Sequence, residues 1–351
     1  MTENPPAPEA FQFIDGLLVC PVCRGPFQSG SAVCETCRRE YEWVGQMANF
    51  LGPQARLQGL DELEASRLWA ENSEVIAAGF ATYAAANADG KRAVLRQIGA
   101  ALGGLDEEQA KRVLFAVQPG QVINDFNRYM NGPGSRRAPT QVATLSFLEE
   151  NFSSGGMVLD AGCSIGHEML EVADANTRMV GIDISMFALC LGDAIWKRTQ
   201  SLPPPSWHAA SILQLPFRDA FFTNVMSFVV LGLVPLRLGL GELGRVLKPG
   251  GQLIFTIEGP GFWRRLWDES PAFGWGRAQL IRWWVGRQLL RFGFQWREIR
   301  GLDRLAGLVQ YSKEMLLNSL DEADFELERL EPLTEYRGTP SLWGITATRA
   351  R

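Results

Sequence analysis

The sequence predicts an α/β fold in which helices cover both faces of a mostly parallel sheet. Residues 157–160 form a short apolar strand that ends in an acid, and a glycine-containing turn then opens a helix. A second apolar strand, 179–183, ends in another acid, and further apolar strands are expected at 224–230 and 252–258. Strands that are separated by helical stretches in this way are typical of a parallel sheet.

The turn after the first strand has the residue types of a ligand-binding loop. Gly162 and Gly166 lack a Cβ, so the backbone can turn sharply and approach a ligand, while N–H groups at the helix start favour a carboxylate. Asp160 precedes the turn and can face an ammonium group through water. The run from 162 to 166 is Gly-Cys-Ser-Ile-Gly, which matches a dinucleotide fingerprint less well.

Four ordered motifs strengthen this interpretation. They are Val-Leu-Asp-Ala-Gly-Cys-Ser-Ile-Gly at 158–166, Gly-Ile-Asp-Ile-Ser at 181–185, Leu-Pro-Phe-Arg-Asp-Ala-Phe-Phe at 215–222 and Arg-Val-Leu-Lys-Pro-Gly-Gly at 245–251. The ordered set resembles the class I S-adenosylmethionine-dependent methyltransferases over residues 151–258, and again over 311–325. This resemblance implies a Rossmann-like sheet with helices on both faces and S-adenosylmethionine as the cofactor.

The same resemblance implies a set of cofactor-binding residues. Asp160, Gly162 and Gly166 would surround the methionine moiety, Asp183 would hold the ribose hydroxyls, and Ile184 would flank the adenine. The full expected set is Asp160, Gly162, Ser164, Gly166, Asp183, Ile184, Ser211, Ile212 and Ser227. Two positions depart from the family pattern, because Ser164 replaces a glycine and Ser211 replaces the usual Asp at the adenine amino group. A hydroxyl can still form a hydrogen bond there.

Four cysteines predict a metal site near the N-terminus. They form the pairs Cys20-Pro-Val-Cys23 and Cys34-Glu-Thr-Cys37, with ten residues between the pairs. This spacing favours a closed, structural zinc site with four thiolate ligands. Iron in a rubredoxin-like site is the alternative, and disulfides are disfavoured in a reducing compartment. Residues 17–51 resemble the small zinc-ribbon module related to the Trm112 family.

Composition limits the class of protein. The chain has 351 residues, 46% of them hydrophobic and 21% charged, as in ordinary soluble globular proteins. A net charge of −5 argues against broad nucleic-acid binding. The N-terminus lacks the basic and apolar regions of a secretory signal, and the apolar stretch 225–236 is too short to cross a bilayer, so a cytoplasmic location is expected.

Three parts are predicted along the chain. They are a zinc ribbon at 1–52, a helical segment at 53–150 and a methyltransferase domain at 151–351. Helices in the second part are expected to break near 88–90 and 103–104, and another is expected at 139–151. Residues 259–311 form an insertion with six of the eleven tryptophans and nine arginines, interpreted as a buried substrate lid. Contact of 259–311 with a membrane surface is the alternative.

Methyl transfer from a sulfonium is an in-line displacement, so a base is needed only when the acceptor retains its proton. The catalytic candidates are His167, Glu258 and Tyr129, whereas His208 is expected to be structural. Residues 227–230 are Ser-Phe-Val-Val rather than the Asn/Asp-Pro-Pro-Tyr/Phe motif, which disfavours methylation of base amino groups by that route.

The favoured function is therefore methylation of a small aromatic or lipophilic acceptor. One alternative is guanine-N1 methylation of rRNA, because such enzymes also pair an N-terminal zinc ribbon with this core. RNA binding would weaken steeply with added salt, unlike binding of a neutral acceptor. Another alternative is a non-catalytic module that binds S-adenosylmethionine, suggested by Ser164, Ser211 and Thr223. The sequence gives no signal for the oligomeric state.

Overall fold

A computed structural model describes residues 16–29, 31–44, 46–51, 86–114, 139–269 and 313–351, together with a few single positions between 68 and 83. Every structural statement below concerns these residues. The chain divides into two compact units, of which the first contains residues 1–137 and 154–221 and the second contains 138–153 and 222–351. Each unit is described by itself.

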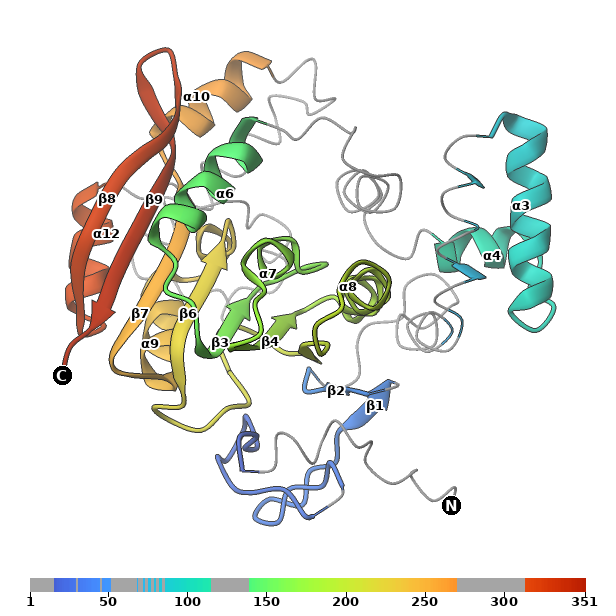
Figure 1. Ribbon diagram of the computed structural model, residues 1–351, viewed down its shortest axis with the longest axis horizontal. Coiled ribbons are helices and arrows are strands. Elements are labelled where there is room, and N and C mark those ends of the chain that lie inside the picture. Colours follow the sequence, from blue (N-terminus) through green and yellow to red (C-terminus); the bar gives the residue numbers. More distant parts are fainter. Residues whose placement is uncertain are drawn as a thin grey trace, which may run out of the picture. The chain divides into compact units, whose positions relative to one another are not determined.

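The first unit has five strands in the order β1-β2-β5-β4-β3 (Figure 1). Their bounds are β1 Glu42–Val44, β2 Met47–Asn49, β3 Gly156–Ala161, β4 Thr177–Asp183 and β5 Ser206–Ala209. Strands β3, β4 and β5 are parallel neighbours. Their carboxyl ends therefore share one edge, the edge at which ligands bind in open α/β sheets.

The zinc-ribbon segment adds its own strands to this row. Strand β2 runs parallel to β5, with Ala48 opposite His208 and Asn49 opposite Ala209, while β1 pairs antiparallel with β2. Main-chain hydrogen bonds thus join the described part of the ribbon to the sheet, a pairing that the sequence of 1–52 does not signal.

The described residues of the first unit also form helices. They are α3 Ala88–Ala101, α4 Glu107–Leu114, α7 His167–Val172 and α8 Met186–Thr199. The predicted break at 103–104 lies between α3 and α4. The break predicted near 88–90 lies at residues 86–87, where the Asn87 side chain accepts a hydrogen bond from the Gly90 N–H and starts α3.

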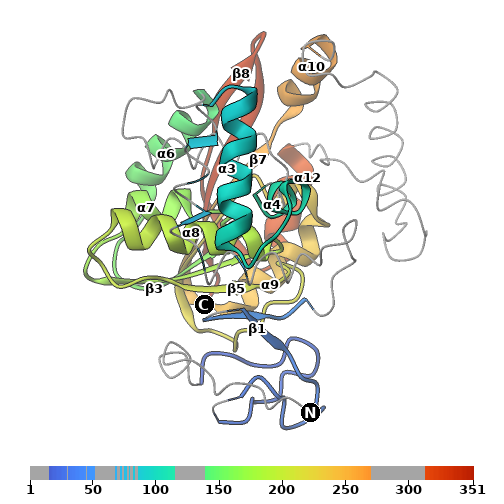
Figure 2. The ribbon, with the colours of Figure 1, turned by 90° about the vertical axis from the view of Figure 1, so that its right-hand side faces the viewer.

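The second unit contains a four-stranded row in the order β6-β7-β9-β8. Its elements are α6 Pro139–Asn151, β6 Phe222–Phe228, η1 Leu231–Leu233, α9 Leu236–Val246, β7 Leu247–Glu258, α10 Pro260–Glu269, α12 Lys313–Asp321, β8 Phe325–Tyr336 and β9 Thr339–Arg349. Strands β6 and β7 are parallel, whereas β9 is antiparallel to both β7 and β8. Helix α6 lies on one side of these strands, with α9 and α12 on the other (Figure 2).

This mixed architecture confirms the predicted α/β fold with helices on both faces. The predicted strands lie within one to five residues of the observed ones. The largest difference at the start of a strand is at β7, which begins at Leu247 instead of residue 252. Strand β6 ends at Phe228 instead of 230 because the chain turns at Val229, which has a φ of 61°. Among the described helices, none has the length and apolarity needed to cross a membrane.

Candidate functional site

The turn between β3 and α7 depends on three left-handed residues. Gly162 and Gly166 have φ values of 87° and 75°, and Ser164 adopts a φ of 50°. Glycine accepts this conformation without steric cost, which gives a physical reason for the glycine usual at the Ser164 position in the family. A Cβ on Gly166 would come within 2.5 Å of the Trp207 ring, so close packing also requires glycine there.

Asp160 is a buried acid at the carboxyl end of β3. Only 1% of its surface is exposed, and its Oδ2 has no hydrogen-bond partner among the described residues. Burial raises the pKa of this carboxyl well above its ordinary value, and the nearby charges of Glu168 and Asp183 raise it further. A cation placed beside Asp160 would therefore be strongly stabilised.

Asp183 is the acid at the carboxyl end of β4, and it accepts a hydrogen bond from the turn between β3 and α7. Its Oδ2 accepts a hydrogen bond from the Ser164 N–H at 2.9 Å, and its Oδ1 accepts one from the Ser185 N–H at 2.8 Å. Burial raises the pKa of Asp183 even though these hydrogen bonds lower it. A carboxylate has about four acceptor positions, so both oxygens retain capacity for ligand hydroxyls.

These two acids fit the cofactor that the sequence implies. S-adenosylmethionine carries an ammonium group, a sulfonium and a ribose diol. Among the described residues, neighbouring strands place one buried and one half-buried carboxyl group at this edge, and neither has a basic group among the causes of its pKa shift. Asp160 is suited to the cationic end and Asp183 to the diol. Their roles remain predictions, as do those of Gly162, Ser164 and Gly166.

The predicted adenine-side residues lie just beyond β4 and β5. Ile184 follows Asp183 and is 65% exposed, which leaves an apolar side chain available to a flat ring. Ser211 begins a tight turn in which its Oγ accepts a hydrogen bond from the Leu213 N–H at 3.2 Å, and Ile212 is buried. The Ala210 N–H donates to the carbonyl of Asp183 at 3.0 Å, so this turn is attached to the end of β4.

Ser227 and Glu258 belong to the second unit. Ser227 is fully buried on β6. Glu258 is the last residue of β7; it is 2% exposed, and neither carboxyl oxygen has a hydrogen-bond partner among the described residues. Burial raises the pKa of Glu258 from 4.5 to about 7. A carboxyl group that titrates near neutral pH is suited to proton transfer.

The other catalytic candidates are less informative. His167 is largely buried as the first residue of α7. Tyr129 lies outside the described residues, as does the predicted lid except for its first part, which contains α10. His208 is fully buried on β5, where its Nδ1 accepts a hydrogen bond from the Ala48 N–H at 3.3 Å.

The left-handed conformation of Val229, in the second unit, has no signal in the sequence. Val229 follows β6 directly and holds the left-handed φ of 61°, while its N–H donates to the Thr256 Oγ1 at 3.1 Å. A β-branched residue in this conformation is strained, and such strain is concentrated at ligand sites. Valine is common in strands, so sequence periodicity simply extends the strand through this position.

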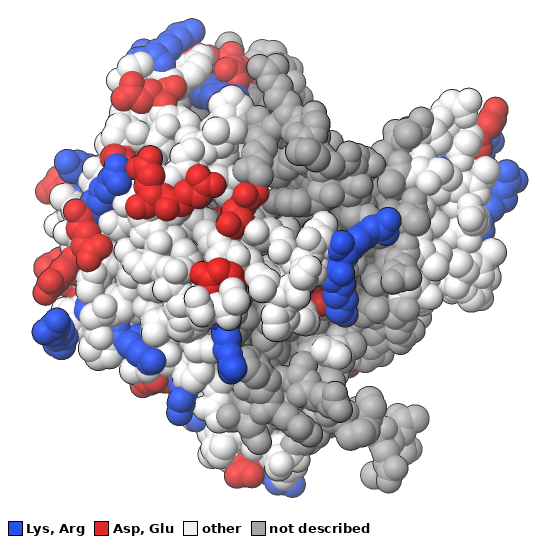
Figure 3. Space-filling view, in the orientation of Figure 1, with Lys and Arg blue, Asp and Glu red and all other residues white. Residues whose placement is uncertain are grey.

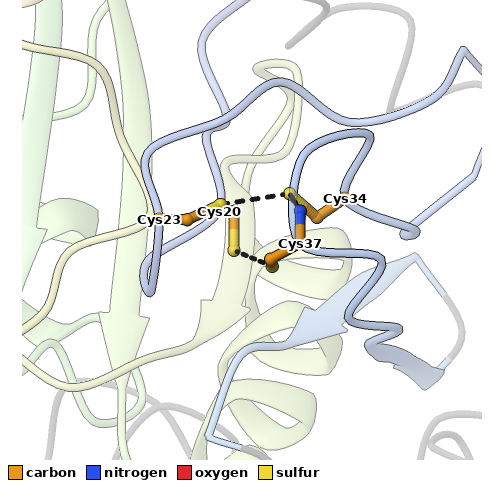
Figure 4. A group of neighbouring side chains, drawn as sticks. All are labelled: Cys20, Cys23, Cys34 and Cys37. Carbon is orange, nitrogen blue, oxygen red and sulfur yellow. Dashed lines mark hydrogen bonds between the residues drawn. The ribbon is translucent and has the colours of Figure 1, made fainter.

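The four cysteines of the ribbon converge on one point (Figure 4). The Sγ atoms of Cys20 and Cys37 are 3.7 Å apart, those of Cys23 and Cys34 are 3.3 Å apart, and all four lie within 4.8 Å of one another. Four thiolates at about 2.3 Å from a tetrahedral metal would be separated by about 3.8 Å. The thiol groups therefore fit a single metal ion with no open position.

Two similar turns build this cluster. Arg24 and Arg38 each follow the second cysteine of a pair, and both are left-handed, with φ values of 63° and 59°. Their N–H groups donate to the carbonyls of Cys20 and Cys34, at 2.8 and 3.0 Å. The rings of Phe27, Tyr41 and Phe50 pack together beside the turns, with centroids 5.3 to 5.9 Å apart.

Comparison with known proteins agrees with this geometry. Residues 159–255 match the family model described as a methyltransferase domain. Residues 159–255 therefore belong to a methyltransferase domain with this α/β fold. The matched segment starts in β3 and ends in β7, so it includes the turn with Asp160, the acid Asp183 and the segment with Ser211.

Several curated relatives are methyltransferases. A demethylmenaquinone methyltransferase of Paenarthrobacter aurescens is 34% identical over 119 residues, which are 33% of this chain and 45% of that protein. A sterol 24-C-methyltransferase of Eremothecium gossypii is 31% identical over 134 residues, 38% of this chain and 35% of that protein. The chain thus spans less than half the length of these two relatives.

A solved structure of geranyl diphosphate C-methyltransferase from Streptomyces coelicolor also aligns. It has a TM-score of 0.41 and 16% identity, and the alignment covers 60% of this chain and 76% of that one. The family match and the named relatives support a methyltransferase domain over residues 159–255. The Trm112-like nature of the ribbon and the cytoplasmic location stay predictions.

Proposed function

We propose that this chain transfers a methyl group from S-adenosylmethionine to a carbon atom of a small lipophilic acceptor. The observation that carries the proposal is the pair of acids at the strand ends of the matched methyltransferase domain, the buried Asp160 and the half-buried Asp183. When bound there, S-adenosylmethionine supplies a methyl group that is already activated by the sulfonium. The protein then has to position the acceptor and exclude water.

The relatives suggest the acceptor class. Their names specify demethylmenaquinone, sterols, and carbon methylation in ubiquinone and menaquinone biosynthesis. These acceptors are apolar and present few groups for hydrogen bonding. The tryptophan-rich composition of residues 259–311 suits such molecules, and this segment is proposed to cover the acceptor.

Carbon methylation gives Glu258 a defined task. A carbon–carbon bond forms while the bond from sulfur to the methyl carbon breaks, and the acceptor carbon must then lose its own proton. We assign this proton to the Glu258 carboxylate, whose oxygens have no other partner among the described residues. A pKa of about 7 lets the group accept a proton and later release it near neutral pH.

An RNA acceptor is less consistent with the charges. On the face drawn in Figure 3, the described Lys and Arg side chains are scattered, and Asp and Glu gather between them. The whole chain carries a net charge of −5. Nucleic-acid binding relies on a continuous basic surface that replaces counterions along the phosphates.

Methyl transfer to a set of defined acceptors tests the proposed acceptor class. The purified protein is given S-adenosylmethionine with a labelled methyl group and, in turn, a demethylated prenyl naphthoquinol, a sterol or an rRNA fragment. We expect label in the quinol or the sterol, and none in RNA. Labelled RNA would contradict the acceptor class, and tight cofactor binding without turnover of any acceptor would favour the non-catalytic module.

We also propose that the ribbon holds one zinc ion, and that the protein resides in the cytoplasm, where the clustered thiols stay reduced. The protein purified without chelator is expected to contain about one zinc per chain by native mass spectrometry. Cys34→Ser should remove the metal, whereas Cys190→Ser, on α8, should retain it. Equal metal content in both variants, or iron in place of zinc, would contradict this assignment.

A further inference from the structure

The segment between β5 and β6 contacts the ribbon through main-chain and side-chain hydrogen bonds. Residues 209–218 include Ser211 and Ile212, the predicted adenine-side residues. The Val19 N–H donates to the Pro216 carbonyl at 2.9 Å, and the Arg218 N–H donates to the Leu17 carbonyl at 3.1 Å. The ribbon's main chain thus forms an antiparallel bridge with the end of this segment.

Side chains add contacts from both directions. Gln214 donates its Nε2 hydrogen to the Pro21 carbonyl at 2.7 Å. In return, Arg24 donates from Nη1 to the Leu215 carbonyl at 3.3 Å. Leu215 and Phe217 are fully buried, so the segment is anchored by apolar packing as well.

The start of the segment is held by the ribbon's strand. The Phe50 N–H donates to the Ala209 carbonyl at 2.8 Å, and the Ala48 N–H donates to the His208 ring. Ala210 in turn donates to Asp183, the predicted ribose acid. Main-chain hydrogen bonds therefore lead from Phe50 of the ribbon, through the adjacent residues Ala209 and Ala210, to Asp183.

The turn that carries two of the predicted metal ligands contacts this segment directly. The carbonyl that accepts from Gln214 belongs to Pro21, which lies between the predicted ligands Cys20 and Cys23. Arg24 directly follows Cys23 in the same turn. A metal ion bound by these thiols would hold the turn in place, and its loss would release the turn.

From these contacts we infer that the metal-bound ribbon positions residues 209–218 for the adenosine end of the cofactor, with Gln214 and Arg24 as positioning residues. Metal occupancy then sets cofactor affinity, although the metal is not part of the reaction. This inference rests on the proposed function, since it takes S-adenosylmethionine as the ligand of this edge.

The first experiment compares metal-loaded protein with protein stripped by a chelator. Hydrogen exchange at the amides of 209–218 should accelerate on stripping, and the Kd for S-adenosylhomocysteine, by calorimetry, should rise at least about fivefold. Unchanged exchange and unchanged affinity in folded, stripped protein would overturn the inference. If the metal-loaded protein does not bind S-adenosylhomocysteine at all, the proposed function is wrong. Hydrogen exchange at 209–218 then still shows whether metal binding stabilises this segment.

A second experiment keeps the metal in place, in case stripping unfolds the chain. The double variant Gln214→Ala and Arg24→Ala removes both side-chain contacts and should weaken cofactor binding about fivefold with full zinc content. Gln214→Glu, which cannot donate, should behave like Gln214→Ala. Glu42→Ala, an exposed change on β1, is the matched control and should bind normally. Normal affinity and normal exchange in the double variant would overturn the role of these two residues.

Discussion

Replacing Glu258 by Gln is expected to lower kcat by about 10²- to 10⁴-fold while leaving the cofactor Kd nearly unchanged. The amide has a similar shape but cannot accept the proton that the acceptor carbon must lose. In the wild type, kcat should rise with pH through about 7, where the Glu258 carboxyl ionises. The variant should lose this dependence. An identical pH profile for both proteins would show that another group is the base.

Glu258→Gln should lower activity but raise the stability of the folded protein at neutral and higher pH. Burial raises the pKa of Glu258 from 4.5 to about 7, so the folded state disfavours the charged form. Below pH 4.5 burial of the neutral carboxyl costs nothing. The cost develops as the pH rises from 4.5 to about 7 and is complete above 7. The free energy of unfolding of the wild type should therefore fall relative to that of Glu258→Gln by about 3 kcal/mol between pH 4 and pH 9.

Chemical denaturation across this pH range measures the difference. Glu326→Gln, at an exposed position on β8, is the matched control and should show neither effect. Loss of activity combined with a gain in stability is typical of a functional residue, whereas loss of both would indicate a structural role.

Replacing Asp183 by Ala should weaken S-adenosylmethionine binding by at least about 100-fold, because hydrogen bonds from ribose hydroxyls to a charged acceptor contribute about 1.5–3 kcal/mol each. The same change also frees the N–H groups of Ser164 and Ser185, so the turn before α7 loses its anchor. Asp183→Asn retains one acceptor oxygen and should give an intermediate loss. Calorimetry measures all three affinities.

A control separates binding from folding. Asp193→Asn breaks only a surface ion pair with Lys197, at 2.7 Å, and should leave both affinity and melting temperature nearly unchanged. If Asp183→Ala remains folded and binds with wild-type affinity, the ligand does not use this acid, and the proposed cofactor site is wrong.

Much of the fold could be predicted because it depends on local patterns. An apolar run that ends in an acid and a glycine turn fixes β3 and the start of α7, since backbone conformation and burial both follow from neighbouring residues. The cysteine spacing likewise predicted which four thiols converge. The strand end at Val229 was missed, because valine gives no local signal for a left-handed turn.

The sequence by itself determined the strand-to-helix unit with its two acids, the four-cysteine cluster and the α/β class, because each is encoded by residues close together in the chain. Only the tertiary structure decided that β2 lies beside β5 and that Gln214 reaches Pro21. These pairs are separated by about 160 and by 193 positions along the chain. The physical reason is that each contact uses a main-chain group on at least one side, and nearly every residue carries such a group, so no local residue pattern marks the partner in advance.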